Sequence, residues 1–300
     1  MTNNPVQNHI GVIGATSLTG TCLLPLLTKA GWQVKAFSRQ IIEPSNEAVE
    51  WQQLPLSKHY FKKSSSPRNP DVIPFWICLA PVWVLPDYFD LLNLQGVQRL
   101  VVLSSTSRFT KDNSTDPKEQ AVAQRLTNAE THVQNWAESH QVEWIILRPT
   151  LIYGLGQDKN ISEIARFIHR FGFFPLLGQA NGLRQPIYVG DVARACLAAV
   201  QTPGCANHAY NISGGEIISY RDMVVRVFNT LSCRPRLLTI PLWAFRLALI
   251  FLRCLPRYRQ WTTAMAERMN QDLVFDHNEA IRDLDFKPKE FILAKEDLPL

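Results

Sequence analysis

The stretch from His9 to Gly20 constrains the fold more than any other part of this 300-residue chain. It runs from an apolar segment through a turn of small residues, with Gly14, Ser17 and Gly20, into a helix-like segment, Leu23 to Ala30. This order suits a nucleotide phosphate, because small residues let the backbone approach a pyrophosphate and a helix N-terminus presents free N–H groups. A glycine pattern alone is weak evidence, so an ordinary strand–turn–helix packed with small residues is the alternative.

The next apolar segment, 32–37, ends in Ser38 and Arg39 and indicates which dinucleotide would fit. Sites for NAD usually place a carboxylate there for the ribose 2′-hydroxyl, whereas an Arg suits the 2′-phosphate of NADP. No Asp or Glu lies between Gly31 and Gln40. The pattern therefore favours NADP(H) over NAD(H), with a solvated Arg at a strand end as the alternative.

Composition narrows the class of protein. A hydrophobic fraction of 46% over 300 residues supports a substantial core, in one large domain or a large domain with a small lobe. The six cysteines are scattered without a C-x-x-C pair, and the histidines have no ligand spacing, so we expect reduced thiols and no metal site. The polar start shows no signal-peptide pattern, which favours a cytoplasmic location. A net charge of +5 without a dense basic run does not suggest nucleic acid as a partner.

Apolar strand-like runs alternate with helix-like segments along the first half of the chain. Further strands are expected within 72–79, 99–103 and 144–147, and a long helix over 117–139 with Asp116 as its cap. The alternation predicts an α/β fold with a doubly wound parallel sheet. Ligands of such sheets bind outside the carboxyl ends of the strands, so the residues after each strand are candidates for a site.

The second half has shorter elements and more Gly and Pro. A short strand over 187–189 is expected to lead to Asp191, which could cap a helix over 192–200. We expect a small C-terminal α/β substrate lobe beside the sheet domain. The predicted sheet domain is 1–155, with 183–212 contributing to the sheet, and the predicted lobe is 156–182 and 213–300.

An apolar segment between Pro241 and Pro256 predicts a helix over 242–255. The segment is too short to span a bilayer, which needs ~20 apolar residues. Its two arginines lie seven residues apart, on one face, so 242–261 could lie in a membrane interface as a peripheral contact. A helix buried in the small lobe, or a contact in a homodimer, is the alternative.

Six segments, taken in order, resemble the extended short-chain dehydrogenase/reductase superfamily, of the NAD(P)-dependent epimerase/dehydratase type. The resemblance implies a Rossmann-type sheet domain that binds the cofactor, and a small-molecule substrate such as a nucleotide sugar or a similar carbonyl compound. The six segments are Gly14 to Gly20, Leu79 to Pro81, Leu103 to Thr106, Leu147 to Gly154, Arg184 to Ala193, and Asn211 to Gly215.

The resemblance carries functional roles onto particular residues. Ser105 and Thr106 stand where the family has its catalytic Ser or Thr, and Tyr153 is a further candidate proton donor. Tyr188 and Arg184 are candidate substrate contacts, the latter because a guanidinium can bind a phosphate or carboxylate with two hydrogen bonds. The implied cofactor contacts are Gly14, Ala15, Thr16, Ser17, Leu18, Thr19, Ser38, Arg39, Leu79, Ala80, Pro81, Ser104, Pro149, Thr150 and Leu151.

The chain departs from the family in its acid–base pair, a Tyr followed four residues later by Lys. None of its seven tyrosines is followed by Lys at that spacing. If Glu130 matches the Glu that commonly follows the pair, Val122 and Leu126 occupy the Tyr and Lys positions. Lys111 and Lys118 are then alternative groups that could approach a substrate.

Two functions stay open at this point. The chain can be an atypical epimerase/dehydratase-like or reductase-like enzyme with another proton donor. It can also be a cofactor-binding sensor, or an accessory or assembly subunit near a membrane, without turnover. Whether it is an enzyme is therefore not decided by the sequence.

Overall fold

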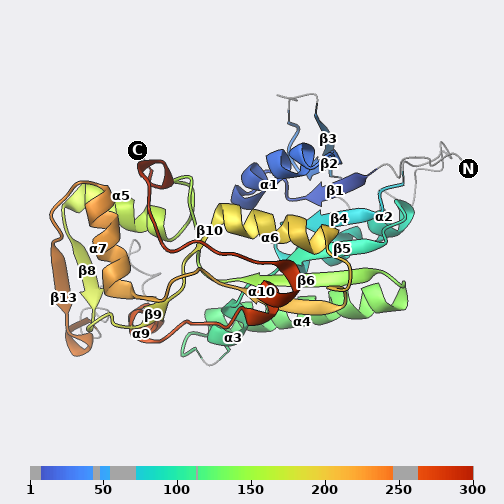
Figure 1. Cartoon of the computed structure of the whole chain (residues 1–300). Coiled ribbons are helices and arrows are strands. Elements are labelled where there is room, and N and C mark those ends of the chain that lie inside the picture. The colour runs from blue at the N-terminus through green and yellow to red at the C-terminus, as the bar shows by residue number, and fades with distance from the viewer. Residues whose placement is uncertain (1–7, 43–47, 55–71, 113, 246–262, 300) are drawn as a thin grey trace, which may run out of the picture.

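A seven-stranded parallel sheet forms the larger part of the molecule (Figure 1). The computed structural model describes residues 8–42, 48–54, 72–112, 114–245 and 263–299. The strand order is β11-β6-β5-β4-β1-β2-β3, with every neighbouring pair parallel. The predicted doubly wound α/β fold is thus confirmed. The strands are β1 (His9–Ile13), β2 (Gln33–Ser38), β3 (Val49–Gln53), β4 (Phe75–Cys78), β5 (Arg99–Leu103), β6 (Glu143–Pro149) and β11 (His208–Ile212).

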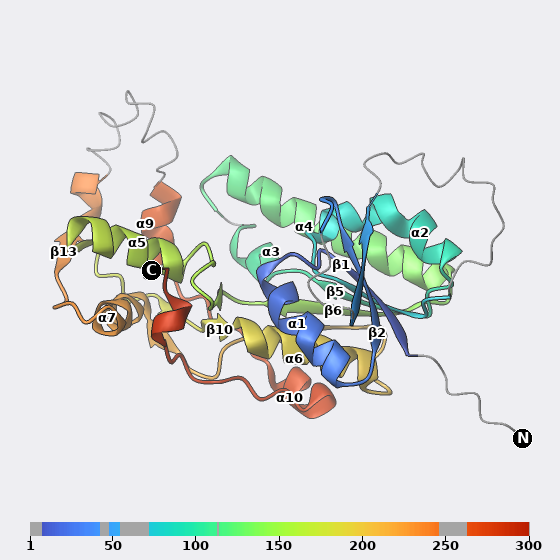
Figure 2. The same ribbon diagram turned by 90° about the horizontal axis from the view of Figure 1, so that it is seen from above.

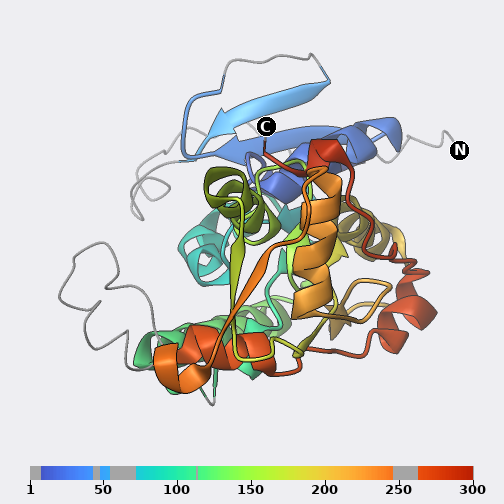
Figure 3. The ribbon, with the colours of Figure 1, turned by 90° about the vertical axis from the view of Figure 1, so that its left-hand side faces the viewer.

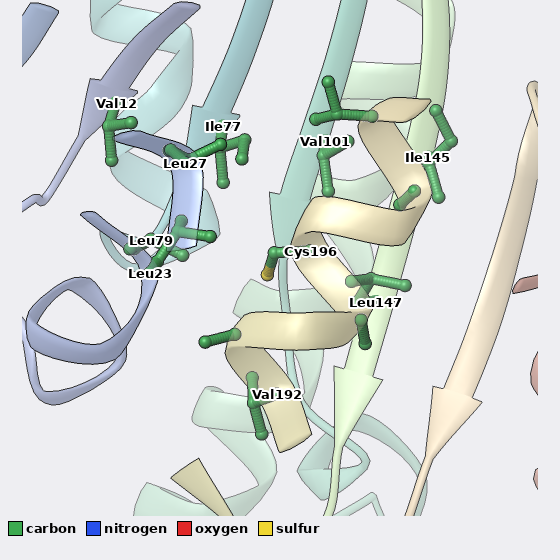
Figure 4. Close-up of a cluster of buried hydrophobic side chains, with 14 of the residues drawn as sticks. Val12, Leu23, Leu27, Ile77, Leu79, Val101, Ile145, Leu147, Val192 and Cys196 are labelled. Atoms are coloured by element: carbon green, nitrogen blue, oxygen red, sulfur yellow. The ribbon is translucent and has the colours of Figure 1, made fainter. Parts of the chain in front are cut away.

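Helices cover both faces of this sheet, as Figure 2 shows from above. One face carries α1 (Leu18–Lys29) and α6 (Val189–Gln201), which pack against each other. The other face carries η2 (Val82–Tyr88), α2 (Phe89–Leu94) and α4 (Pro117–Ser139). Each face has its own buried apolar cluster, and Figure 4 shows the first of them between the strands and the helices α1 and α6.

Among the described residues, the smaller lobe contains the helices α5 (Ile161–Phe171), α7 (Tyr220–Thr230) and α9 (Thr263–Asn270) and short strand pairs (Figure 3). Its parallel pair joins β8 (Phe174–Leu177) and β13 (Leu237–Ile240), and its antiparallel pair joins β9 (Leu183–Arg184) and β12 (Ile218–Ser219). A third pair, β7 (Ile152–Tyr153) with β10 (Ile187–Tyr188), lies where the chain passes between the two parts.

The C-terminal segment also crosses between the two parts. Helix α10 (Asn278–Leu284) packs near β11 and α6, and the chain then returns to the lobe and ends after η4 (Lys295–Asp297) (Figure 1). The division into 1–155 with 183–212, and 156–182 with 213–300, stays a prediction.

A local signal explains the start of α4 but not that of α6. Helix α4 begins at Pro117, and the Asp116 carboxylate accepts a hydrogen bond from the Lys118 N–H at 2.9 Å, as the sequence predicted. Helix α6 begins at Val189 rather than at 192, so the expected capping role of Asp191 is wrong. Asp191 lies inside the first turn, where its carboxylate accepts a hydrogen bond from the backbone N–H of Lys289 at 2.9 Å.

The predicted apolar helix over 242–255 lies largely outside the described residues, which include only its first four positions. Of those, Phe245 is buried against the lobe and Trp243 is exposed. Among the helices that the structure describes, none is long and apolar enough to cross a membrane.

Candidate cofactor and substrate site

The turn between β1 and α1 has the geometry of a phosphate cradle. Gly14 has a left-handed φ of +76°, which a side chain would disfavour. Ser17 caps α1, and its hydroxyl oxygen accepts the Gly20 N–H at 3.2 Å, which leaves the hydroxyl proton free to donate. The first turn of α1 contains no acidic residue. The first N–H groups of a helix lack partners within it, so this end can receive an anion.

The loop after β4 lies directly against this turn. The Leu79 N–H donates to the Ile13 carbonyl at 2.8 Å. A Cβ on Gly14 would lie 2.6 Å from the backbone nitrogen of Ala80, so only glycine permits this approach. The structure therefore brings together two of the segments predicted to contact the cofactor, with Leu79 buried and Pro81 exposed.

The end of β2 supplies the third segment of this edge. Ser38 is buried, and its hydroxyl accepts the Gln40 N–H at 3.1 Å. Arg39 follows it and is exposed, while its carbonyl accepts a hydrogen bond from the Gln53 side chain at 3.2 Å. The side chain of Arg39 is thus available at the strand end where the sequence placed a 2′-phosphate contact.

The ends of β5 and β6 are joined by backbone and hydroxyl hydrogen bonds. The Ser104 N–H donates to the Leu147 carbonyl at 2.7 Å. The N–H and the hydroxyl of Thr106 both donate to the Pro149 carbonyl, each at 3.1 Å. The Thr150 N–H in turn donates to the Ile212 carbonyl at 3.1 Å. Ser104, Pro149 and Thr150 therefore lie side by side at the carboxyl edge, and the Thr106 hydroxyl donates its proton to a carbonyl.

The buried carboxylate of Glu130, beneath this edge, binds the guanidinium groups of two arginines. Glu130 of α4 is 1% exposed and accepts hydrogen bonds from Arg148, with Nη2 at 2.7 Å and Nε at 3.1 Å from Oε2. It also accepts from the guanidinium of Arg108 and from the Ser104 hydroxyl. Both guanidinium groups lie near the ring of Phe109, at 5.1 and 5.4 Å from its centroid. Arg108 was not identified from the sequence, because nothing local pairs it with a residue 22 positions later.

The face of α4 on the N-terminal side of Glu130 is apolar. Leu126 is 4% exposed, Val122 is half-buried, and both pack with the core between α4 and the sheet. Residues at i, i+4 and i+8 share one helix face, so Val122 and Leu126 lie on the same face of α4 as Glu130. Neither side chain can donate or accept a proton.

The candidate proton donor Tyr153 of β7 and the candidate substrate contact Tyr188 of β10 are both engaged in packing. Tyr153 is 1% exposed, its hydroxyl donates to the Ile292 carbonyl at 3.4 Å, and burial raises its pKa far above the ordinary value. The ring of Tyr188 lies 5.6 Å from that of Tyr153, and burial raises its pKa as well. The Lys289 ammonium lies 4.5 Å from the centroid of the Tyr188 ring.

Arg184 lies inside the small lobe. It is 4% exposed, and its guanidinium donates to the carbonyls of Gln271 and Leu183, each at 2.7 Å, and to that of Arg268. Burial lowers its pKa to about 10. These bonds hold the C-terminal end of α9, a geometry that favours a structural role over the predicted contact with substrate.

The small lobe closes against α3 (Ser107–Thr110) and the start of α4. Arg268 forms an ion pair with Glu119 at 2.7 Å, and the ring of Phe275 lies 6.0 Å from that of Phe109. Lys111 is half-buried nearby, and burial lowers the pKa of its ammonium. Within the described ranges, no three His, Cys, Asp or Glu side chains gather as a metal site would need.

Comparison with known proteins places this fold in a class. Residues 87–213 match the family described as "NAD dependent epimerase/dehydratase family", a stretch that runs from η2 to the end of β11. The chain superposes on the UDP-glucose 4-epimerase of Thermotoga maritima with a TM-score of 0.68 and 15% identity, covering 96% of each chain. An epimerase from Methanothermobacter thermautotrophicus gives a TM-score of 0.71 and 16% identity, over 97% of this chain and 89% of that one. The fold is therefore the Rossmann-type fold of these epimerases.

Curated relatives define the resemblance further. The chain is 28% identical over 100 residues to "NADH dehydrogenase [ubiquinone] 1 alpha subcomplex subunit 9, mitochondrial" of Arabidopsis thaliana, which is 33% of this chain and 25% of that protein. It is 22% identical over 138 residues to a UDP-glucose 4-epimerase of Vibrio cholerae, 46% of this chain and 42% of that one. These matches span less than half the length of either relative. The predicted resemblance to the epimerase/dehydratase type of the extended short-chain dehydrogenase/reductase superfamily is confirmed.

Proposed function

We propose that this chain binds NADP(H) at the carboxyl edge of its sheet and does not perform the Tyr–Lys acid–base chemistry of its family. On this reading it works as a cofactor-dependent sensor, or as an accessory or assembly subunit. The similarity to a subunit of a respiratory NADH dehydrogenase supports the second of these roles. The packing of Leu126 and Val122 into the core is the observation that carries the proposal.

The residues at the edge fit a dinucleotide. The glycine at 14 leaves a cradle that a Cβ would fill, and the capped N-terminus of α1 without acidic residues suits a pyrophosphate. Gly14 to Thr19 would hold the pyrophosphate, Ser38 and Arg39 the 2′-phosphate, and Leu79, Ala80 and Pro81 the adjoining ribose. Ser104, Pro149, Thr150 and Leu151 would line the nicotinamide end. When bound, the cofactor supplies a hydride donor or acceptor.

Val122 and Leu126 of α4 have no group that can transfer a proton. The hydroxyls of Ser104 and Thr106 donate to Glu130 and to the Pro149 carbonyl, and Tyr153 is buried with a raised pKa. The Glu130 carboxylate is already engaged by two guanidinium groups, and the Thr106 hydroxyl has only a carbonyl as its acceptor, so neither hydroxyl has a free base beside it. Hydride movement to or from a sugar hydroxyl therefore has no partner proton step at these positions.

A second candidate function is catalysis with a different donor. The Ser105 hydroxyl accepts the Ser107 N–H at 3.1 Å and so retains its own proton, and Lys111 lies beside the same segment. Similarity to a UDP-glucose 4-epimerase makes a nucleotide sugar the substrate class to test.

Cofactor titration of the full chain is the first experiment. Energy transfer from its eight tryptophans to NADPH or NADH reports binding. We expect saturable binding with NADPH tighter than NADH. Replacing Arg39→Asp should weaken NADPH binding about 10- to 100-fold, because one charged contact is lost and a repulsion is added, with little change for NADH. An Arg282→Asp variant on α10 is the matched control. Equal losses for both cofactors would refute the 2′-phosphate assignment.

Turnover is tested separately, with the same protein. The chain is incubated with NAD or NADP and UDP-glucose, and both reduced nicotinamide and epimerised sugar are measured. We expect neither to form. Formation of product that Ser105→Ala or Lys111→Met abolishes would refute the non-catalytic proposal and identify the alternative donor.

A further inference from the structure

The outer end of the small lobe carries a surface of arginines and exposed apolar side chains. Strand β13 lies at the end of the molecule remote from the seven-stranded sheet (Figure 1). In the described residues β13 pairs with β8 on one side only. Its outward residue Leu238 is 52% exposed, and Trp243, just after the strand, is 68% exposed. Apolar exposure of this extent at one site indicates contact with another surface.

The end of α5 extends this surface. The Phe174 N–H donates to the Arg236 carbonyl at 2.9 Å, which places the turn after α5 beside the segment that enters β13. Phe171 is 50% exposed at the end of α5. In Figure 3 this side of the lobe, with the β8–β13 pair, faces the viewer.

The charges on this surface have one sign. Arg170, Arg234 and Arg236 are exposed, and none of them forms an ion pair with any residue that the structure describes. Arg170 lies instead over the ring of Phe171, at 5.3 Å from the centroid. Guanidinium groups bind phosphate oxygens with two hydrogen bonds, and their long stems can rest on apolar surface.

We propose that this surface, defined by Arg170, Phe171, Arg234, Arg236, Leu238 and Trp243, docks on an anionic phospholipid bilayer. Trp at the headgroup level, apolar side chains below it and arginines facing the phosphates are the chemistry of an interfacial contact. A second copy of the chain fits less well, since a two-fold contact would bring two sets of unpaired arginines together without carboxylates. The surface lies apart from Gly14, Arg39 and Glu130, so docking and cofactor binding are independent.

Vesicle sedimentation of the full chain tests the proposal. Phosphatidylcholine vesicles with phosphatidylglycerol should bind the protein, vesicles of phosphatidylcholine alone should not, and added salt should release it. An R234E/R236E variant should lose at least about 30-fold in affinity, because each arginine near an anionic surface contributes about fivefold. An R282E/K287E variant on and after α10 changes the net charge equally and should bind normally. Both variants should still bind NADPH like the parent chain, which shows that they are folded.

Brominated lipid quenches the fluorescence of a nearby indole, so it tests whether Trp243 enters the bilayer. We expect quenching by brominated phosphatidylglycerol vesicles that a Trp243→Phe variant reduces. No binding to the anionic vesicles, or equal binding by R234E/R236E, would overturn the proposal. A dimer in light scattering that R234E/R236E dissociates, without any vesicle binding, would assign the surface to a second copy instead.

Discussion

Removing the buried carboxylate of Glu130 should destabilise the protein strongly. The side chain of Glu130 is 1% exposed, and those of its partners Arg108 and Arg148 are 20% and 13% exposed. Glu130→Ala leaves two largely buried guanidinium groups without their counter-charge and the Ser104 hydroxyl without its acceptor. Breaking a buried pair from one side costs about 3–5 kcal/mol, because the remaining charge stays desolvated.

Companion variants separate the charge effect from the loss of side-chain volume. Glu130→Gln keeps the shape and one acceptor oxygen, so its cost should be smaller, about 1.5–3 kcal/mol for a charged hydrogen bond. A triple variant, Arg108→Met with Glu130→Met and Arg148→Met, removes every charge of the cluster and fills similar space. Replacing a complete buried ion cluster by apolar residues is often close to neutral. The triple variant should therefore be more stable than Glu130→Ala.

Urea unfolding at neutral pH, followed by circular dichroism without cofactor, measures these free energies of unfolding. The expected order of stability is parent, Glu130→Gln, then Glu130→Ala, with the triple variant above Glu130→Ala. A loss of less than about 1 kcal/mol for Glu130→Ala would show that the carboxylate is not the counter-charge of both arginines. A triple variant as unstable as Glu130→Ala would show that side-chain packing, and not unpaired charge, sets the cost.

Three further outcomes are expected. Gly14→Val should abolish binding of both NADPH and NADH, because its Cβ would lie 2.6 Å from the Ala80 nitrogen. Gly14→Ala should weaken the binding of both cofactors, and its thermal melt shows whether it is folded. Undiminished binding by a folded variant would refute the role of the Gly14 turn as a phosphate cradle. The hydrogen bonds and the charge of Arg226 hold the pKa of Glu216 below its ordinary value of 4.5. The ionised Glu216 therefore stabilises the folded state at a pH above 4.5, and this contribution is lost as the pH falls through the lower pKa of the folded state. Glu216→Gln should therefore flatten the acid limb of the unfolding free energy, and an unchanged limb would contradict this. Arg184→Met should lower the free energy of unfolding by about 3 kcal/mol, since backbone carbonyls lose a charged donor, with hydrogen exchange in α9 rising first.

Elements with strong local signals could be predicted from the sequence almost to the residue. Helix α4 runs from Pro117 to Ser139 and β5 from Arg99 to Leu103, as expected, because a cap with proline and a short apolar run fix them. Strand β3 was missed, since its pattern Val-Glu-Trp-Gln-Gln is half polar at the sheet edge and buries little. The early start of α6 was missed because Gly190 disfavours a helix locally, and packing against α1 overrides that preference.

The candidate site also has a part that local sequence predicts and a part that it does not. The phosphate turn around Gly14 and Ser17 is local, so its position and its helix cap follow from neighbouring residues. The partners of Glu130 and the buried position of Arg184 depend on chain segments far apart in sequence, which no spacing rule brings together. Arg184 was expected to face a substrate, yet its guanidinium holds the backbone at the end of α9, where only the folded lobe supplies carbonyl acceptors.

Different parts of the chain hold the two halves of the proposed site at the carboxyl edge. The proposed dinucleotide half depends on the backbone of the turns after β1 and β4, where Gly14 and Ala80 meet. Under the proposed function, the acid–base half would depend on side chains of α4, where Val122 and Leu126 instead extend the apolar core up to the buried Glu130. Apolar residues at these two positions add to that core and do not touch the phosphate turn. Under the proposed function, changes at Val122 and Leu126 should therefore leave cofactor affinity unchanged, whereas loss of the phosphate turn would remove cofactor binding and, with it, any hydride transfer.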